Sequence, residues 1–178
     1  MIKWALENGC PTTSELCTAL AADGFLDMLK FAREKGTPWS SDTFDAAARH
    51  GDLALMTWLK EQGCPWSTQT CSAAVYCGPL KTLVWLRENG CEWDEQVMLA
   101  AVSGGHLDIL KWAKENECPV SPKVCAKAVE LNRFEMLKWL RANGFPWDEK
   151  VSATAAVCGN LEMLAWLREN GCPWNPAK

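Results

Sequence analysis

The stretch WLRENGCPW, residues 166–174, occurs with small changes four times in the chain. The other copies are WLKEQGCPW at 58–66, WLRENGCEW at 85–93 and WLRANGFPW at 139–147. Equivalent positions in these copies are separated by 27 residues or by twice that number. Internal repeats of about 20–50 residues are typical of proteins in which small units stack on one another. The sequence therefore predicts a stacked repeat architecture.

Tryptophan marks the repeat at two positions. The first series is Trp4, Phe31, Trp58, Trp85, Trp112, Trp139 and Trp166. The second is Trp39, Trp66, Trp93, Trp147 and Trp174, interrupted at Thr12 and Val120. Because no insertion or deletion breaks the spacing, we expect a single repeat domain over residues 1–178. Its divisions are a partial unit 1–12, units 13–39, 40–66, 67–93, 94–120, 121–147 and 148–174, and a tail 175–178.

Each unit is expected to contain two short helices. The residues suited to cap the first helix are Ser40, Ser67, Asp94, Ser121 and Asp148, whose side-chain oxygens can accept free amide hydrogens. In the unit 40–66, a first helix at 41–50 has an apolar stripe that includes Phe44 and Ala47. Gly51 ends this helix, and a second helix from Leu53 follows.

The segment NGCPW is interpreted as a structural joint. Gly63 supplies the left-handed backbone that closes a helix, and Pro65 prevents the helix from continuing. Cys64 lies between them, where a small apolar side chain contacts the last helical turn. The repeated stretch is thus predicted to be a helix stop and a corner, and not a chemical site.

The stretches AARHGDLALMTWLKEQGC (47–64) and GGHLDILKWAKENEC (104–118) resemble the ankyrin repeat pattern. Ankyrin repeats have 33 residues, whereas six residues are missing here where ankyrins build a β-hairpin finger. The resemblance implies an all-α, right-handed helix-pair solenoid of stacked ankyrin-like repeats lacking β-hairpin fingers. It also implies a non-enzymatic scaffold that binds other proteins, with the first helices as the contact surface.

Composition restricts the classes of function. The chain has 178 residues, 48% of them hydrophobic, and a formal net charge of −4. It contains no apolar run of 18 residues and no secretory leader, so we expect no membrane partner. The ten cysteines are then expected to be reduced thiols in the cytoplasm or nucleus. The acidic balance argues against nucleic acid as a partner.

The repeated side chains are expected to be structural. The tryptophans point inward in the helical pattern, so we predict that they pack in the core. Corner cysteines such as Cys64 recur one unit apart, too far for a zinc site or a disulfide along the column. A basic column such as Arg33 and Lys60 runs beside an acidic one, which is typical of a solvated face. We expect no cofactor and no metal; the alternative is a thiol-rich redox or metal-binding protein.

Catalytic residues are scarce. His50 and His106 are the two histidines, and no nucleophile elbow, zinc motif or phosphate loop is present. The chain is therefore not expected to be an enzyme.

Positions that differ from unit to unit are free to select a partner. They fall on one face of each first helix and on the turn that follows it, where stacked repeats present extended binding surfaces. The candidate binding residues are Asp45, Arg49, Asp52, Ser72, Tyr76, Leu99, Ser103, His106, Lys127, Glu130 and Arg133. Tyr76 and Leu99 are the expected anchors, because a few aromatic or apolar residues dominate most interfaces.

Two further expectations concern irregular parts of the repeat. Glu117 and Asn132 replace glycines where a left-handed backbone is needed, which predicts a looser joint. The first unit lacks its first helix, so its N-terminal end is expected to be uncapped. We expect either a monomer or a dimer formed through this end. A substrate adaptor fragment of a larger ankyrin array is a further alternative.

Overall fold

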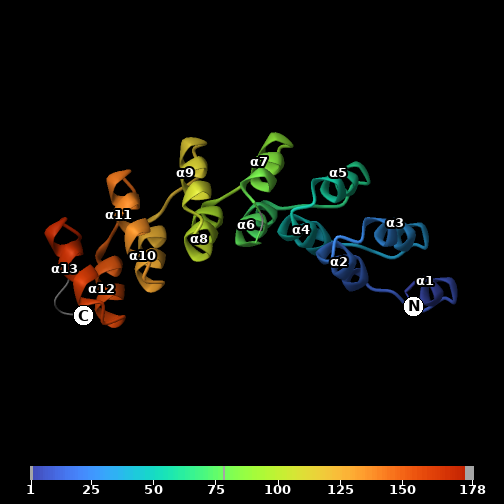
Figure 1. The fold of residues 1–178 in the computed structure, drawn as a ribbon, viewed down its shortest axis with the longest axis horizontal. Helices are drawn as coiled ribbons and strands as arrows, with labels where there is room; N and C mark the ends of the chain where they lie inside the picture. Colours follow the sequence, from blue (N-terminus) through green and yellow to red (C-terminus); the bar gives the residue numbers. More distant parts are fainter. Residues whose placement is uncertain (1, 78, 175–178) are drawn as a thin grey trace. The chain divides into compact units, whose positions relative to one another are not determined.

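The computed structural model describes residues 2–77 and 79–174, and these residues form thirteen helices without a strand (Figure 1). The predicted tail 175–178 lies outside the described residues. The first seven helices are α1 (Ile2–Glu7), α2 (Ser14–Ala22), α3 (Leu26–Glu34), α4 (Ser41–His50), α5 (Leu53–Glu61), α6 (Thr68–Cys77) and α7 (Leu80–Glu88). The remaining helices are α8 (Glu95–Gly104), α9 (Leu107–Glu115), α10 (Pro122–Glu130), α11 (Phe134–Ala142), α12 (Glu149–Val157) and α13 (Leu161–Glu169).

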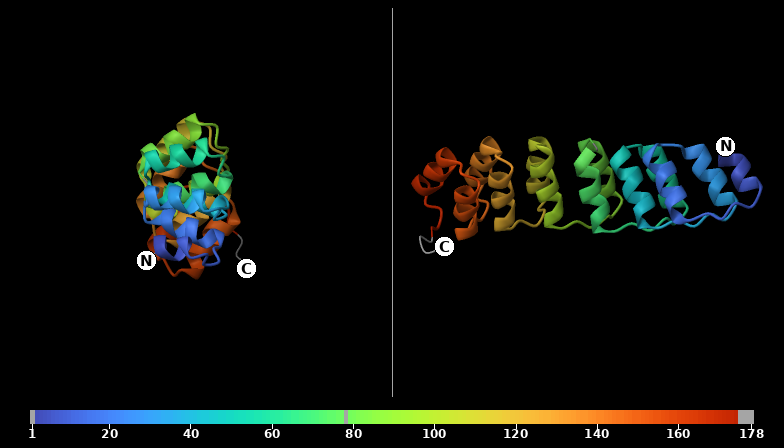
Figure 2. Two further views of the ribbon diagram at one scale, coloured as in Figure 1. Left: turned by 90° about the vertical axis from the view of Figure 1, so that its right-hand side faces the viewer. Right: turned by 90° about the horizontal axis from the view of Figure 1, so that it is seen from below.

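The helices form two compact units, an N-terminal unit of residues 1–93 and a C-terminal unit of residues 94–178. In the N-terminal unit, the first helices α2, α4 and α6 pack side by side, and α3, α5 and α7 form a second row. The C-terminal unit repeats the arrangement with α8, α10 and α12 in one row and α9, α11 and α13 in the other. Figure 2 shows the two rows from other directions. The predicted pair of helices is therefore present in each full repeat.

Most helix starts are capped as the sequence predicts. The carboxylate of Asp94 accepts a hydrogen bond of 2.9 Å from the backbone N–H of Gln96, and Asp148 binds the N–H of Lys150 at 3.0 Å. Ser40 accepts from the N–H of Asp42 at 3.3 Å. Ser121 differs, because its side chain makes no capping bond; its helix instead begins with a proline, whose missing N–H needs no partner.

The helix ends use the predicted left-handed residue. Gly63 has a φ of +72°, and the N–H of Cys64 donates to the carbonyl of Leu59 at 2.9 Å, which closes the last turn. Glu117 and Asn132 adopt the same conformation with φ of +60° and +53°, although neither is a glycine. The two irregular joints predicted from the sequence thus keep the regular backbone, at a cost in conformational strain.

The buried core consists mainly of aliphatic and small side chains together with Phe44 and Phe145, and four corner cysteines belong to it. Cys64, Cys91, Cys118 and Cys172 are buried. Each thiol donates to the carbonyl oxygen of the capping residue 24 positions earlier, for example Cys91 Sγ to Ser67 O at 3.4 Å. In these four repeats the small side chain predicted at the corner therefore also ties the end of the repeat back to its beginning.

The tryptophans do not form the centre of the core, and this part of the prediction is wrong. Trp4 and Trp174 are exposed, and the other nine are half-buried. Trp39 meets Trp58 edge to face with ring centroids 5.9 Å apart, and Trp147 meets Trp166 at 6.1 Å. The rings pair across successive repeats because a corner tryptophan lies beside the second helix of the next repeat.

The basic column is likewise not a purely solvated face. The guanidinium group of Arg33 lies 3.9 Å from the ring centroid of Trp39, and Arg141 lies 4.2 Å from that of Trp147. Arg33 Nη1 also donates to the backbone oxygen of Thr37. Since a guanidinium group over an indole face is attracted to the ring quadrupole, these arginines cover the outer side of the tryptophan pairs.

Candidate functional site

The candidate binding residues of the N-terminal unit do not all lie at the surface. Arg49 and Tyr76 are exposed, with Tyr76 at 54%. Asp52 is half-buried and caps α5 by accepting from the N–H of Ala54 at 2.9 Å. Ser72 is half-buried and donates to the carbonyl of Gln69 at 2.8 Å. Arg49 and Tyr76 are therefore the candidates of this unit whose side chains are most accessible to a partner, because Asp52 and Ser72 are held by local hydrogen bonds.

Asp45 is a correction to the predicted surface. It is 6% exposed, and its carboxylate accepts a hydrogen bond from the hydroxyl of Thr70 on the next first helix. Burial raises the pKa of the Asp45 carboxyl, while the bond from Thr70 acts in the opposite direction. Asp45 joins α4 to α6 and is not available to a partner. The 3–4 spacing placed it on the exposed face because spacing alone does not show how closely the neighbouring helix approaches.

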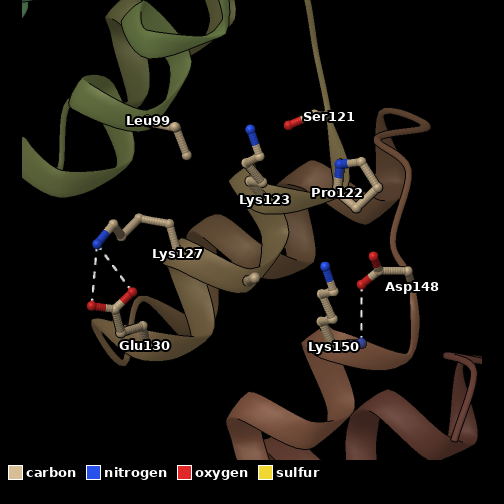
Figure 3. Close-up of a pocket in the computed structure, with 9 residues that line it drawn as sticks. Leu99, Ser121, Pro122, Lys123, Lys127, Glu130, Asp148 and Lys150 are labelled. Carbon is tan, nitrogen blue, oxygen red and sulfur yellow. Dashed lines mark hydrogen bonds and ion pairs between the residues drawn. The ribbon is translucent and has the colours of Figure 1, made fainter.

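The C-terminal unit contains a groove of about 400 Å³ on its row of first helices (Figure 3). Leu99 of α8, Pro122 and Ala126 of α10 contribute apolar surface to it. The polar residues that line it are Ser121, Lys123, Lys127, Glu130, Asp148 and Lys150. Three candidate residues, Leu99, Lys127 and Glu130, are thus brought together around one depression.

The groove exists because one column of side chains changes along the chain. Residues 27 apart in this column are Thr18, Asp45, Ser72, Leu99, Ala126 and Ala153. In the N-terminal unit, Thr18 and Asp45 reach across to the next first helix and hydrogen bond there. Ala126 has no side chain that could reach across. The first helices also pack less closely in the C-terminal unit than in the N-terminal unit, which leaves the space open.

The rim of the groove carries three lysines on two helices. Lys123 pairs with Glu95 at 2.5 Å, and Lys127 pairs with Glu130 at 3.0 Å. The ammonium group of Lys123 holds the pKa of the Glu95 carboxyl below its usual range. Lys150 is exposed beside Asp148, whose carboxylate caps α12. Exposed pairs of this kind contribute about 0–1 kcal/mol and exchange readily for other partners.

The three remaining candidate residues lie at the end of α8 and in the turns that precede α9 and α11. Arg133 is exposed, and its guanidinium group lies over Gly105 and donates to the carbonyl oxygen of Ser103 at 3.5 Å. Ser103 itself is half-buried at the end of α8. The ring of His106 is half-buried and lies against Gly104. These side chains contact neighbouring turns, so they border the groove helices without lining the groove.

The candidate residues predicted from the sequence do not include Pro122, Lys123, Ala126 and Lys150, which also line the groove. A signal for the two lysines was present, because their column reads Glu15, Asp42, Gln69, Gln96, Lys123 and Lys150 along the chain. The charge of this column changes from negative in the N-terminal unit to positive in the C-terminal unit. Ala126 could be recognised only once the gap beside it was known.

Two of the buried thiols, Cys64 and Cys125, are held far from ionisation. Burial raises the pKa of Cys64 and of Cys125 to about 12, so both thiols are protonated at neutral pH. Cys71 donates to the backbone oxygen of Cys91 at 4.0 Å. Within residues 2–77 and 79–174, no group of three metal-binding side chains converges. None of the helices in these segments has the length and apolar character needed to cross a bilayer.

Comparison with known proteins identifies the fold. No family model and no curated protein sequence matches the chain. Among solved structures, the human ASB11 ankyrin repeat domain aligns with a TM-score of 0.68 and 20% sequence identity, covering 88% of this chain and 84% of that one. The pentatricopeptide repeat protein PPR10, solved in complex with an 18-nt psaJ RNA element, reaches a TM-score of 0.44 at 17% identity and covers 95% of this chain and 30% of that one. The chain therefore has an ankyrin-like helix-pair fold, as predicted, with the β-hairpin fingers absent from its described residues.

Proposed function

We propose that this protein is a non-enzymatic scaffold that binds another protein through the exposed face of its first helices. The groove lined by Leu99, Pro122 and Ala126 is the observation that carries the proposal. It combines an apolar floor with charged side chains at its edge, which is the usual composition of a recognition surface. The first helices of the N-terminal unit add a second contact point at exposed Tyr76.

The fold supports the same proposal. Stacked repeats present extended surfaces, and the residues that vary between repeats are those that can encode a ligand. Here the thiols and tryptophans repeat and hold the helices together, whereas the column of Leu99 and Ala126 varies and faces the groove. A partner that contacts this column would therefore read the part of the repeat that differs from unit to unit.

Affinity capture from a cell extract tests the proposal. Wild-type protein is compared with Leu99→Asp, which places a charge in the groove, and with Tyr76→Ala. Glu169→Lys on α13 serves as a control, because Glu169 is exposed on the other row of helices. We expect partners that are retained by the control and lost with Leu99→Asp. Equal capture by all four proteins would exclude the first-helix face as the binding surface.

A further inference from the structure

We infer that the groove of the C-terminal unit binds an acidic peptide segment that inserts one apolar side chain; this inference rests on the proposed protein-binding function. The groove of about 400 Å³ has room for one large side chain beside Leu99 and Ala126. The three lysines of its rim, Lys123, Lys127 and Lys150, provide the charge that an acidic segment would meet.

The positions of two of these lysines do not contribute to helix stability. Lys123 is the second residue of α10, and Lys150 is the second residue of α12. The N-terminal turn of a helix carries a partial positive charge, so a cation there is unfavourable and an anion is favoured. Two lysines in this position therefore cost the isolated protein stability. Lys123 instead reinforces the attraction of the start of α10, where Ser121 makes no capping bond, for an incoming carboxylate. Lys150 adds a positive charge beside the Asp148 cap of α12.

The acidic groups at the rim leave this attraction in place. The carboxylate of Asp148 is held by the N–H of Lys150 as a helix cap, so it faces the backbone. Glu95 and Glu130 pair with Lys123 and Lys127 at the surface. A peptide carboxylate can replace either of them at little cost, because exposed ion pairs are weak. Among the six first helices from α2 to α12, α10 is the one with a net positive charge in its sequence.

The apolar floor distinguishes this surface from a general basic patch. Lysines alone would attract any polyanion, whereas Leu99, Pro122 and Ala126 offer a site for an aliphatic or aromatic side chain. The expected ligand is therefore a segment with a central apolar residue and acidic residues on both sides. The apolar anchor supplies affinity, while the flanking charges supply selectivity and speed of association.

A peptide-binding experiment tests the inference. The probe is a fluorescein-labelled heptapeptide with leucine at its centre and three glutamates on each side, measured by fluorescence anisotropy at low and moderate salt. Two matched probes replace all glutamates by lysine, or the leucine by serine. We expect the acidic leucine probe to bind at least about tenfold more tightly than either of them, and binding to weaken as salt increases.

Variants of the protein identify the groove as the place of binding. Ala126→Leu fills the groove and should weaken the acidic probe about tenfold, while Ala153→Leu, one repeat later in the same column and exposed, should not. Lys150→Glu should weaken the binding of the acidic probe similarly, whereas Lys111→Glu, at an exposed position of α9, should not. Far-UV circular dichroism checks that each variant is folded. Equal binding of acidic and basic probes, or insensitivity to Ala126→Leu and Lys150→Glu, would overturn the inference.

A random-peptide library separates this inference from the proposed function. Peptides are selected on wild-type protein and counter-selected on Ala126→Leu. Groove-dependent peptides that are rich in acidic residues support both proposals. Groove-dependent peptides that are neutral or basic leave the scaffold function standing and overturn the acidic ligand. If no groove-dependent peptide is recovered, both the acidic ligand and the groove as the binding surface are overturned.

Discussion

The hydroxyl of Thr70 donates a hydrogen bond of 2.5 Å to the buried carboxylate of Asp45 and so links helices α4 and α6. The Thr18 and Thr43 hydroxyls make a similar link at 3.2 Å between α2 and α4. In the C-terminal unit the corresponding column is apolar, with Leu99 and Ala126. Polar side chains thus close the first-helix row in one unit, and the lack of them leaves a groove in the other.

Thr70→Val should destabilise the protein by about 1–3 kcal/mol at neutral pH, because a buried carboxylate loses its donor. Burial raises the pKa of Asp45 in the folded state. The contribution of Asp45 to the free energy of unfolding is therefore complete below the pKa of the unfolded chain, near 4, and is lost as the pH rises through the pKa of the folded state. The hydrogen bond from Thr70 favours the charged form of Asp45. The cost of Thr70→Val should therefore shrink in acid, where the carboxyl is protonated. Urea unfolding between pH 3 and pH 7 measures this dependence. In an Asp45→Ala background the same substitution should cost much less, and an undiminished cost there would contradict the link.

Glu117→Gly should stabilise the protein by about 1 kcal/mol, because Glu117 has a φ of +60° that suits glycine. The reverse change at the equivalent joint, Gly63→Glu, should cost a similar amount. An added Cβ at Gly63 meets no atom within 4 Å, so backbone strain is the sole expected cost there. Chemical denaturation of the two variants tests the pair. Opposite signs are required; a loss of stability in both would refute the account of the joint.

The buried thiols should make the protein sensitive to alkali. Thiols ionise near pH 8.5 in an unfolded chain, whereas the pKa values of Cys64 and Cys125 are raised to about 12 by burial. Their stabilising contribution is therefore complete below about pH 8.5 and is lost as the pH rises toward 12. At pH 10 the expected loss is about 2 kcal/mol for each thiol. Unfolding free energies at pH 8 and pH 10 measure the loss, and the Cys64→Ala/Cys125→Ala double variant should show a clearly smaller one.

Trp85→Ala should cost about 2–4 kcal/mol, since the half-buried ring loses apolar contacts and its edge-to-face contact with Trp66 at 6.4 Å. Trp4 occupies the equivalent position in α1 but is 69% exposed. Trp4→Ala should therefore change stability by about 0.5 kcal/mol or less. Thermal unfolding followed by circular dichroism compares the two. Similar midpoints for Trp85→Ala and wild type would show that the ring pairs do not hold the repeats together.

Much of the fold follows from the sequence because the repeats use the same kinds of residue to begin and end their helices. The period of 27, the closing glycine at Gly63 and the capping residue Asp94 determine where helices end and begin, and the structure confirms them. Local rules do not determine how much of a large ring is covered. The predictions for Trp58 and Arg33 are wrong for this reason, because Arg33 stacks on Trp39 and Trp58 meets the same ring edge to face at the margin of the core.

The candidate site was less predictable than the fold. Variation between repeats predicts Leu99, Lys127 and Glu130, and these three residues line the groove. Asp45 was misplaced because its burial depends on the approach of α6, a tertiary property. Ala126 was missed for the opposite reason, since a small side chain carries no chemical signal until the space that it leaves is seen.

The thiol of Cys91 binds the carbonyl of Ser67 within the same 27-residue stretch, whereas the tryptophan pairs bridge consecutive stretches. The thiol contacts therefore lie within one repeat, whereas the tryptophan contacts join each repeat to the next one and use the same positions in each. Insertion or deletion of whole 27-residue periods would preserve both kinds of contact, while a change that is not a whole number of periods would break them. Such a molecule can gain or lose first-helix surface in discrete steps without a change in the packing of its interior.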